Sequence, residues 1–141
     1  MSEIPFPQAD KLEKVLKLVR NLETHSKKDL MSVLGLGTPR QLQYYISAAM
    51  FLGFITTTQN NIELTNSGKR VLQESKDFYK ERFILGLLKH KLIKAVIFNY
   101  EEKTILDVLE DFDSFSTLSD STKKRRVETI KKWVEWLNKN I

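Results

Sequence analysis

Apolar side chains recur at intervals of three and four residues along most of the chain, the spacing of one helix face. In the first half this pattern predicts helices over residues 9–22, 27–34 and 39–52. Asp10 lies at the start of the first helix, and Ser26 and Thr38 precede the second and third. Each is expected to accept a hydrogen bond from a free backbone N–H of a first turn. Pro39 suits the first position of the third helix because its missing N–H costs nothing there. The predicted buried face of this helix is Leu42, Tyr45, Ile46, Ala49 and Leu52.

The period changes to two after Gly53, which we expect to end the third helix with a positive φ. Residues 54–58 and 62–65 are rich in β-forming side chains, and residues 59–61 have the chemistry of a hairpin turn. A tight Gly35-Leu36-Gly37 turn joins the second and third helices. The order helix, helix, helix, strand, strand predicts a winged helix-turn-helix, with the third helix as recognition helix and the hairpin as wing.

The second half is helical by the same criterion. It predicts a long or broken helix over about 77–99, a short helix over 104–112, and a final helix over 122–138 capped by Ser121, with Trp133 and Trp136 in its core. The layout is again typical of a helix-turn-helix, without a wing. The predicted fold class is mainly α: a winged helix-turn-helix domain over residues 1–75, followed by a second, degenerate helix-turn-helix domain over residues 76–141.

Charge adds a candidate partner. The chain has a net charge of +5 at pH 7, which suits DNA, because cations that displace phosphate counterions supply most non-specific affinity. The densest cluster opens the final helix, where each cation opposes the helix dipole at about 0.3–1 kcal/mol unless phosphates offset it. The alternative is that these cations form an ordinary solvated surface with no phosphate partner. The cluster comprises Lys123, Lys124, Arg125 and Arg126.

The chain contains no cysteine, which excludes disulfides and thiolate metal sites and favours a cytoplasmic location. Its first residues lack the basic and apolar regions of a signal peptide. No apolar stretch approaches the roughly 20 residues that cross a bilayer, so we expect no membrane association.

The residues expected to contact double-stranded DNA lie in three places. Arginine pairs bidentately with guanine and glutamine with adenine, which favours the exposed face of the third helix. For each residue the alternative is an ordinary surface position. The predicted set is Thr38, Arg40, Gln41, Gln43, Tyr44 and Ser47 on the third helix, Asn60 at the wing tip, and Ser121, Thr122, Lys123, Lys124, Arg125 and Arg126 on the final helix.

Catalysis finds little support in the sequence. His25 and His90 are isolated, and two histidines without cysteine make a zinc site improbable. The one pattern to test is Asp77 followed by Glu101-x-Lys103, which is typical of metal-dependent nucleases that activate a water on Mg²⁺. Its surroundings predict helix and loop rather than a paired strand, so we expect no catalytic, metal or cofactor site in this chain.

Several of these motifs occur together in one known group. The motifs are Phe6-Pro7-Gln8-Ala9-Asp10, Pro39-Arg40-Gln41-x-x-Tyr44-Tyr45, Leu64-Thr65-x-x-Gly68 and Arg125-Arg126-x-x-Thr129-Ile130-x-x-Trp133. Together they resemble the N-terminal tandem helix-turn-helix region of a group of bacterial type II restriction endonucleases. The resemblance implies sequence-specific DNA recognition that positions a separate, Mg²⁺-dependent nuclease domain in cis. The alternatives are a protein-interaction winged-helix module and a stand-alone transcriptional regulator. The sequence shows no obvious dimerisation helix.

Overall fold

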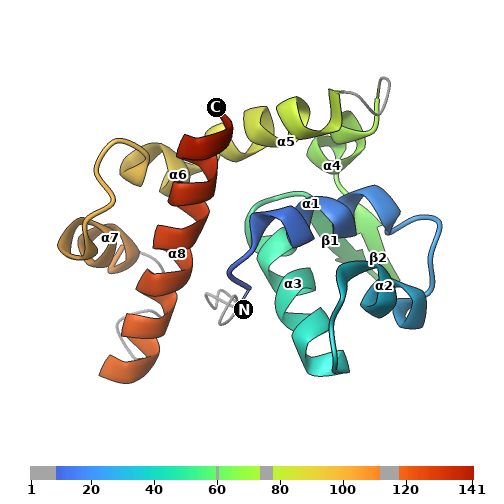
Figure 1. Cartoon of the computed structure of the whole chain (residues 1–141), viewed down its shortest axis with the longest axis horizontal. Helices are drawn as coiled ribbons and strands as arrows, with labels where there is room; N and C mark the ends of the chain where they lie inside the picture. The colour runs from blue at the N-terminus through green and yellow to red at the C-terminus, as the bar shows by residue number, and fades with distance from the viewer. Residues whose placement is uncertain (1–8, 60, 74–77, 112–117) are drawn as a thin grey trace.

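A computed structural model describes residues 9–59, 61–73, 78–111 and 118–141. Within these residues the chain is mainly helical with one small antiparallel hairpin. The elements are α1 (Leu12–Asn21), α2 (Lys27–Leu34), α3 (Pro39–Phe51), β1 (Ile55–Thr58), β2 (Asn61–Leu64), α4 (Asn66–Val71), α5 (Tyr79–Leu88), α6 (Lys91–Val96), α7 (Glu102–Leu109) and α8 (Asp120–Asn140). Figure 1 shows α1 to α4 on one side and α6 to α8 on the other, with α5 running between them.

The first three helices follow the predicted pattern. Ser26 Oγ accepts from the Asp29 N–H at 3.2 Å, and Thr38 Oγ1 accepts from the Gln41 N–H at 3.2 Å, so both predicted caps are confirmed. Gly35 ends α2 in the left-handed conformation with a φ of 69°. The apolar face predicted for the third helix is buried in full. α1 packs against both α2 and α3.

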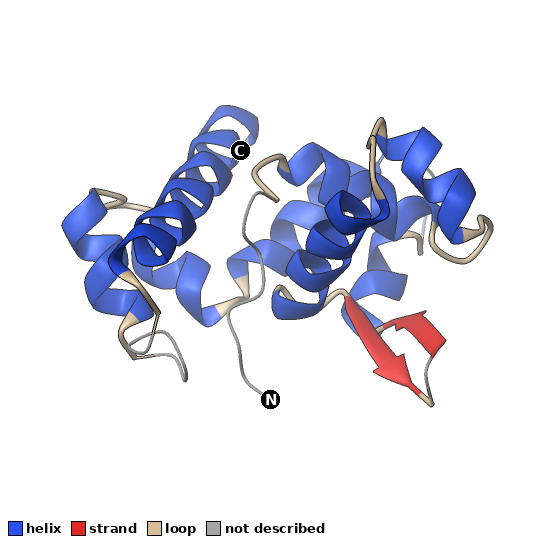
Figure 2. Cartoon of the chain, turned by 90° about the horizontal axis from the view of Figure 1, so that it is seen from below, coloured by secondary structure: helices blue, strands red, loops and turns tan. Residues whose placement is uncertain are grey.

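The hairpin pairs Ile55 with Leu64 and Thr58 with Asn61, and it projects from the edge of the helical body (Figure 2). Gly53 precedes it with a φ of 90°, as predicted. Asn60 lies outside the described residues. Thr65 was expected in the second strand, but it caps α4 instead, because its Oγ1 accepts from the Gly68 N–H at 3.1 Å.

The segment predicted as a long or broken helix is broken at His90, which separates α5 from α6. The last helix begins earlier than predicted, at Asp120. Ser119, not Ser121, is its cap, and Ser119 Oγ accepts from the Thr122 N–H at 3.3 Å. The four cations therefore follow the first turn, and the expected opposition to the helix dipole is weaker than the sequence suggested.

Aromatic side chains connect the two halves of the chain. The Phe54 and Phe83 ring centroids are 4.9 Å apart, and Phe83 meets Trp136 edge to face at 6.0 Å. Trp133 is fully buried, as predicted, and its Nε1 donates to the Ala9 carbonyl at 2.7 Å. One cluster of buried residues runs through both halves. The division at residue 75 remains a prediction. Among the described residues, no helix has the length and apolar character needed to cross a membrane.

Candidate nucleic-acid interface

The exposed side of α3 carries one polar stripe. Arg40, Gln43, Tyr44 and Ser47 are spaced three and four residues apart, which places them along one helix face. Arg40 and Gln43 are exposed, whereas Tyr44 and Ser47 are half-buried. The opposite face is held in the core through Leu42, Tyr45 and Ile46, so the stripe has a fixed orientation.

Hydrogen bonds within the stripe orient its side chains. Arg40 Nε donates to the Tyr44 hydroxyl, and Gln43 Nε2 donates to Ser47 Oγ at 3.3 Å. The guanidinium carbon of Arg40 lies 5.6 Å from the Tyr44 ring centroid, and its two terminal nitrogens are further hydrogen-bond donors. Gln41 is different, because its Oε1 accepts from the Gly37 N–H at 2.9 Å and supports the turn before α3.

Two lysines outside the predicted set lie beside this stripe. Lys27 and Lys28 open α2 and are exposed. They share a surface depression of about 440 Å³ with Pro39 and Gln43 of α3. The sequence signal for these two residues was a pair of consecutive lysines directly after the Ser26 cap. Lysines are so common on protein surfaces that this pair alone did not indicate a DNA contact. Their position adds positive charge next to the polar stripe.

The hairpin contributes polar surface without cations. Thr56, Thr57, Thr58 and Gln59 are exposed, and so is Glu63 on the paired strand. Hydroxyl and amide groups can hydrogen-bond to phosphate or sugar, but they add no net attraction to a polyanion. Arg40, Lys27 and Lys28 therefore add positive charge beside the stripe, and the hairpin does not.

The basic start of α8 is more engaged within the protein than its sequence suggests. Lys123 Nζ lies 3.3 Å from Glu110 Oε1. Ser121 and Thr122 hydroxyls interact with Ser119 Oγ at 3.3 and 2.8 Å. Lys124 is exposed, and Arg126 is half-buried.

Arg125 is held by Asp10, which does not cap α1 as predicted. Both terminal nitrogens of Arg125 donate to the Asp10 carboxylate, and Thr129 and Lys132 donate to it as well. Burial acts to raise the pKa of Asp10, but the hydrogen bonds from Arg125, Thr129 and Lys132 together outweigh it. The pKa of Asp10 therefore lies below its ordinary value, and the site is a charged connection between the N-terminal segment and α8.

Figure 1 shows how α3 and α8, the two helices predicted to contact DNA, are placed in the molecule. α3 and α8 both begin at the lower edge of the molecule, and both run upward from there. The N-terminal ends of α3 and α8 therefore lie at the same edge of the molecule in this view.

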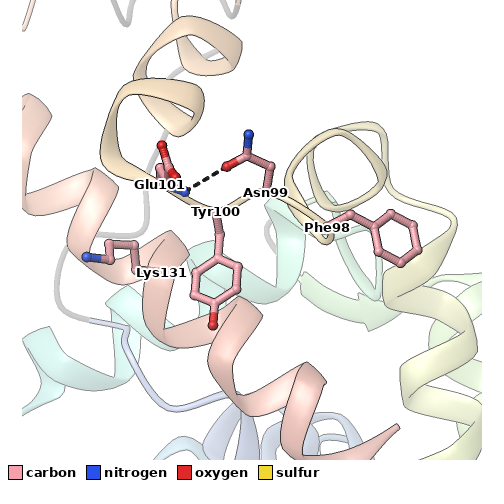
Figure 3. Close-up of a pocket in the computed structure, with 5 residues that line it drawn as sticks. All are labelled: Phe98, Asn99, Tyr100, Glu101 and Lys131. Carbon is pink, nitrogen blue, oxygen red and sulfur yellow. Dashed lines mark hydrogen bonds between the residues drawn. The ribbon is translucent and has the colours of Figure 1, made fainter.

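The nuclease pattern does not form a catalytic arrangement among the described residues. Glu101 is exposed and precedes α7, and its backbone N–H donates to Asn99 Oδ1 at 3.4 Å (Figure 3). The preceding residues form α6 rather than a strand. Lys103 is exposed, and Asp77 lies outside the described residues. No group of three or more histidine, aspartate or glutamate side chains suited to a metal ion is found among the residues that were placed.

One protein family matches residues 14–141, and its description reads "Domain of unknown function (DUF7226)". The chain belongs to this family. The DUF7226 match begins within α1 and continues through α8, so it includes the α3 stripe, the hairpin and the basic start of α8. Asp10 lies ahead of the DUF7226 match. No curated protein and no solved structure matches the chain.

Proposed function

We propose that this protein binds double-stranded DNA, and that α1 to β2 act as a winged helix-turn-helix with α3 as the reading helix. The observation that carries the proposal is the polar stripe of α3, which is fixed by a buried opposite face and is followed directly by a projecting hairpin. The proposal is sequence-specific binding, because the stripe contains side chains that distinguish base edges rather than cations alone.

The dimensions of the stripe suit a major groove. Arg40 and Ser47 are seven residues apart, which corresponds to about 10 Å along a helix. A major groove is about 12 Å wide and admits a helix. With Nε held by Tyr44, the Arg40 fork is oriented before DNA arrives, and this fork matches the O6 and N7 acceptors of guanine. Gln43 is the candidate for adenine.

Phosphate contacts come from different residues in this proposal. Lys27 and Lys28 flank the stripe and would lie against the backbone on one side of the groove. On α8, Lys124 is the exposed member of the basic cluster. Arg125 already has Asp10 as its partner, so it would reach DNA only after leaving that carboxylate. The proposed base and phosphate contacts are therefore Arg40 and Gln43, and Lys27, Lys28 and Lys124.

A restriction-endonuclease context is a further part of the proposal and rests on the sequence resemblance alone. In that setting this chain would recognise DNA, and a separate domain would cut it with Mg²⁺. Incubating the purified chain with plasmid DNA and Mg²⁺ tests this division. We expect no cleavage by these residues, whereas cleavage lost on Glu101→Ala would contradict the division of roles.

Fluorescence anisotropy with labelled random-sequence duplexes tests the binding itself. We expect saturable binding that weakens steeply between about 50 and 200 mM salt. Lys28→Ala should weaken binding to all sequences and reduce the salt slope by about one, whereas Arg40→Ala should cost about 1–3 kcal/mol on a selected sequence only. Lys94→Ala, at an exposed position of α6, is the matched control and should bind like the wild type. Absence of binding at the lowest salt contradicts the proposal, and the protein-interaction alternative would then be favoured.

A further inference from the structure

A small pocket of about 120 Å³ lies between α4 and α5. Most of its lining side chains are basic or carry a hydroxyl, and none of its described lining residues is acidic. The lining residues are Ser67, Arg70, Arg82, Leu85, Gly86 and Lys89. Figure 1 shows α4 and α5 at the upper edge of the molecule, away from the start of α3 at the lower edge. The pocket is therefore separate from the surface proposed for DNA.

Helix spacing brings its cations together. Ser67 and Arg70 are three residues apart on α4, Arg82 is on α5, and Lys89 directly follows the last residue of α5. Side chains of both helices therefore line the same pocket. Cations from two different elements converge on one small space.

Two glycines fix the separation of these helices. A Cβ atom on Gly68 of α4 would lie 2.3 Å from the Phe54 carbonyl oxygen. A Cβ atom on Gly86 of α5 would lie 2.6 Å from Phe54 Cε1. Both helices therefore approach Phe54, which is fully buried, as closely as a backbone without a side chain allows. The pocket is preformed by this packing and needs no ligand to assemble it.

The chemistry of the lining residues indicates the ligand class. A cleft lined by charges of one sign with apolar walls concentrates the potential within it, and Leu85 and Gly86 supply such walls here. Arginine forks match the oxygen geometry of phosphate, and lysine adds a point charge. A volume of about 120 Å³ holds roughly four water molecules at about 30 Å³ each, which suits one tetrahedral oxyanion.

We propose that this pocket binds a single phosphate group. Arg70, Arg82 and Lys89 supply the positive charge, and the Ser67 hydroxyl donates a hydrogen bond. The phosphate belongs either to a small phosphorylated compound or to a nucleic-acid backbone, and the chemistry of recognition is the same in both cases. The proposal is independent of DNA binding by α3, because none of the residues that line the pocket is among the proposed DNA contacts.

Amide chemical shifts of the ¹⁵N-labelled full chain, titrated with inorganic phosphate at constant ionic strength, test the proposal. We expect saturable shifts at Ser67, Gly86 and Lys89. Arg70→Gln should weaken the affinity at least tenfold, because a charged fork is lost while an exposed helical position keeps its fold. Lys80→Gln, at a position of α5 outside the pocket lining, is the control and should leave the affinity unchanged.

A second arm identifies the source of the phosphate. If a random-sequence duplex shifts the same amides and Arg70→Gln removes these shifts, the proposal holds with a nucleic-acid phosphate as the ligand. If only inorganic phosphate shifts them, it holds with a small phosphorylated compound. Shifts that fail to saturate, that chloride reproduces at equal ionic strength, or that survive Arg70→Gln unchanged would overturn it. None of these outcomes depends on whether α3 binds DNA.

Discussion

The Asp10 carboxylate binds both terminal nitrogens of the Arg125 guanidinium, with 2.9 Å from Nη2 to Oδ2 and 3.1 Å from Nη1 to Oδ1. The two residues are 115 positions apart in sequence. Thr129 Oγ1 adds a hydrogen bond of 2.7 Å to Oδ1. The segment ahead of α1 is thereby fixed to α8, next to the hydrogen bond from Trp133 Nε1 to the Ala9 carbonyl.

We expect Asp10→Asn to lower the free energy of unfolding by about 1–2 kcal/mol, because it removes charge-assisted hydrogen bonds while keeping the side-chain size. We expect a loss toward the low end of what charged hydrogen bonds usually contribute to the free energy of unfolding. The reason is that the Arg125 side chain is 35% exposed and solvent screens the pair. Urea unfolding measures the change. Asp107→Asn, at an exposed position of α7, is the control and should stay within about 0.5 kcal/mol of the wild type.

The Asp10–Arg125 pair makes the free energy of unfolding depend on pH in the acid range. The pKa of Asp10 is lower in the folded protein than in the unfolded chain, so its contribution is present above the unfolded value and is lost as the pH falls through the folded value. The stability difference between wild type and Asp10→Asn should therefore shrink below about pH 4. A difference of equal size at pH 7 and pH 3 would contradict this assignment.

The start of α8 gives a prediction from the corrected helix cap. Ser119→Ala should lower the free energy of unfolding by about 1 kcal/mol, because Ser119 Oγ accepts a hydrogen bond from the free Thr122 N–H at the N-terminus of α8. Ser121→Ala lies within the first turn and should change the free energy of unfolding by a few tenths of a kcal/mol. Thermal unfolding of the two variants compares them directly. A larger loss at Ser121 than at Ser119 would restore the cap assigned from the sequence.

Local chemistry explains which parts of the fold could be predicted. Ser26, Thr38 and Gly53 act through the backbone within a few residues, so spacing along the chain was sufficient to assign them. The same reasoning was wrong for Asp10, whose partners lie on α8. Ser119 and Ser121 both have capping chemistry, and only the actual path of the chain decides between them.

The candidate site was predictable to a similar extent. The α3 face follows from helical periodicity, so the sequence alone places Arg40 and Tyr44 on a common stripe. The positions of Lys27 and Lys28 beside that stripe depend on the angle between α2 and α3, which periodicity does not specify. The pocket between α4 and α5 depends on how both helices approach Phe54.

His90 gives a prediction near neutral pH. Its Nε2 lies 2.9 Å from the Phe51 carbonyl oxygen, and its Nδ1 accepts from the Leu92 N–H at 3.1 Å. Both contacts are satisfied by the neutral ring protonated on Nε2. Burial lowers the pKa of His90, although the hydrogen bond to Phe51 acts in the opposite direction. The stabilising contribution is therefore present above the unfolded pKa, about 6.5, and is lost as the pH falls through the folded value.

Urea unfolding between pH 7.5 and pH 5 tests this sign. The wild type should lose stability as the pH falls, and His90→Ala should be less stable at pH 7.5 by about 1–2 kcal/mol, with less pH dependence. Ser32→Ala, at an exposed position of α2 without a titratable side chain, is the control and should keep the wild-type pH dependence. If His90→Ala kept the full pH dependence of the wild type, the role of His90 would be contradicted.

The last prediction concerns Gly68, which allows α4 to reach the Phe54 carbonyl. Alanine in a helix is usually better than glycine by about 1 kcal/mol, so Gly68→Ala should stabilise α4 if the position has room. An added Cβ would instead lie 2.3 Å from a backbone oxygen that cannot rotate away. We expect a net loss of about 1–3 kcal/mol, since α4 must shift from the core. At Gly37 a Cβ meets only Gln41 Oε1 at 3.8 Å, so Gly37→Ala is the control and should be close to neutral in urea unfolding. A Gly68→Ala protein at least as stable as the wild type would show that α4 tolerates displacement, and the fixed separation of α4 and α5 would then no longer hold.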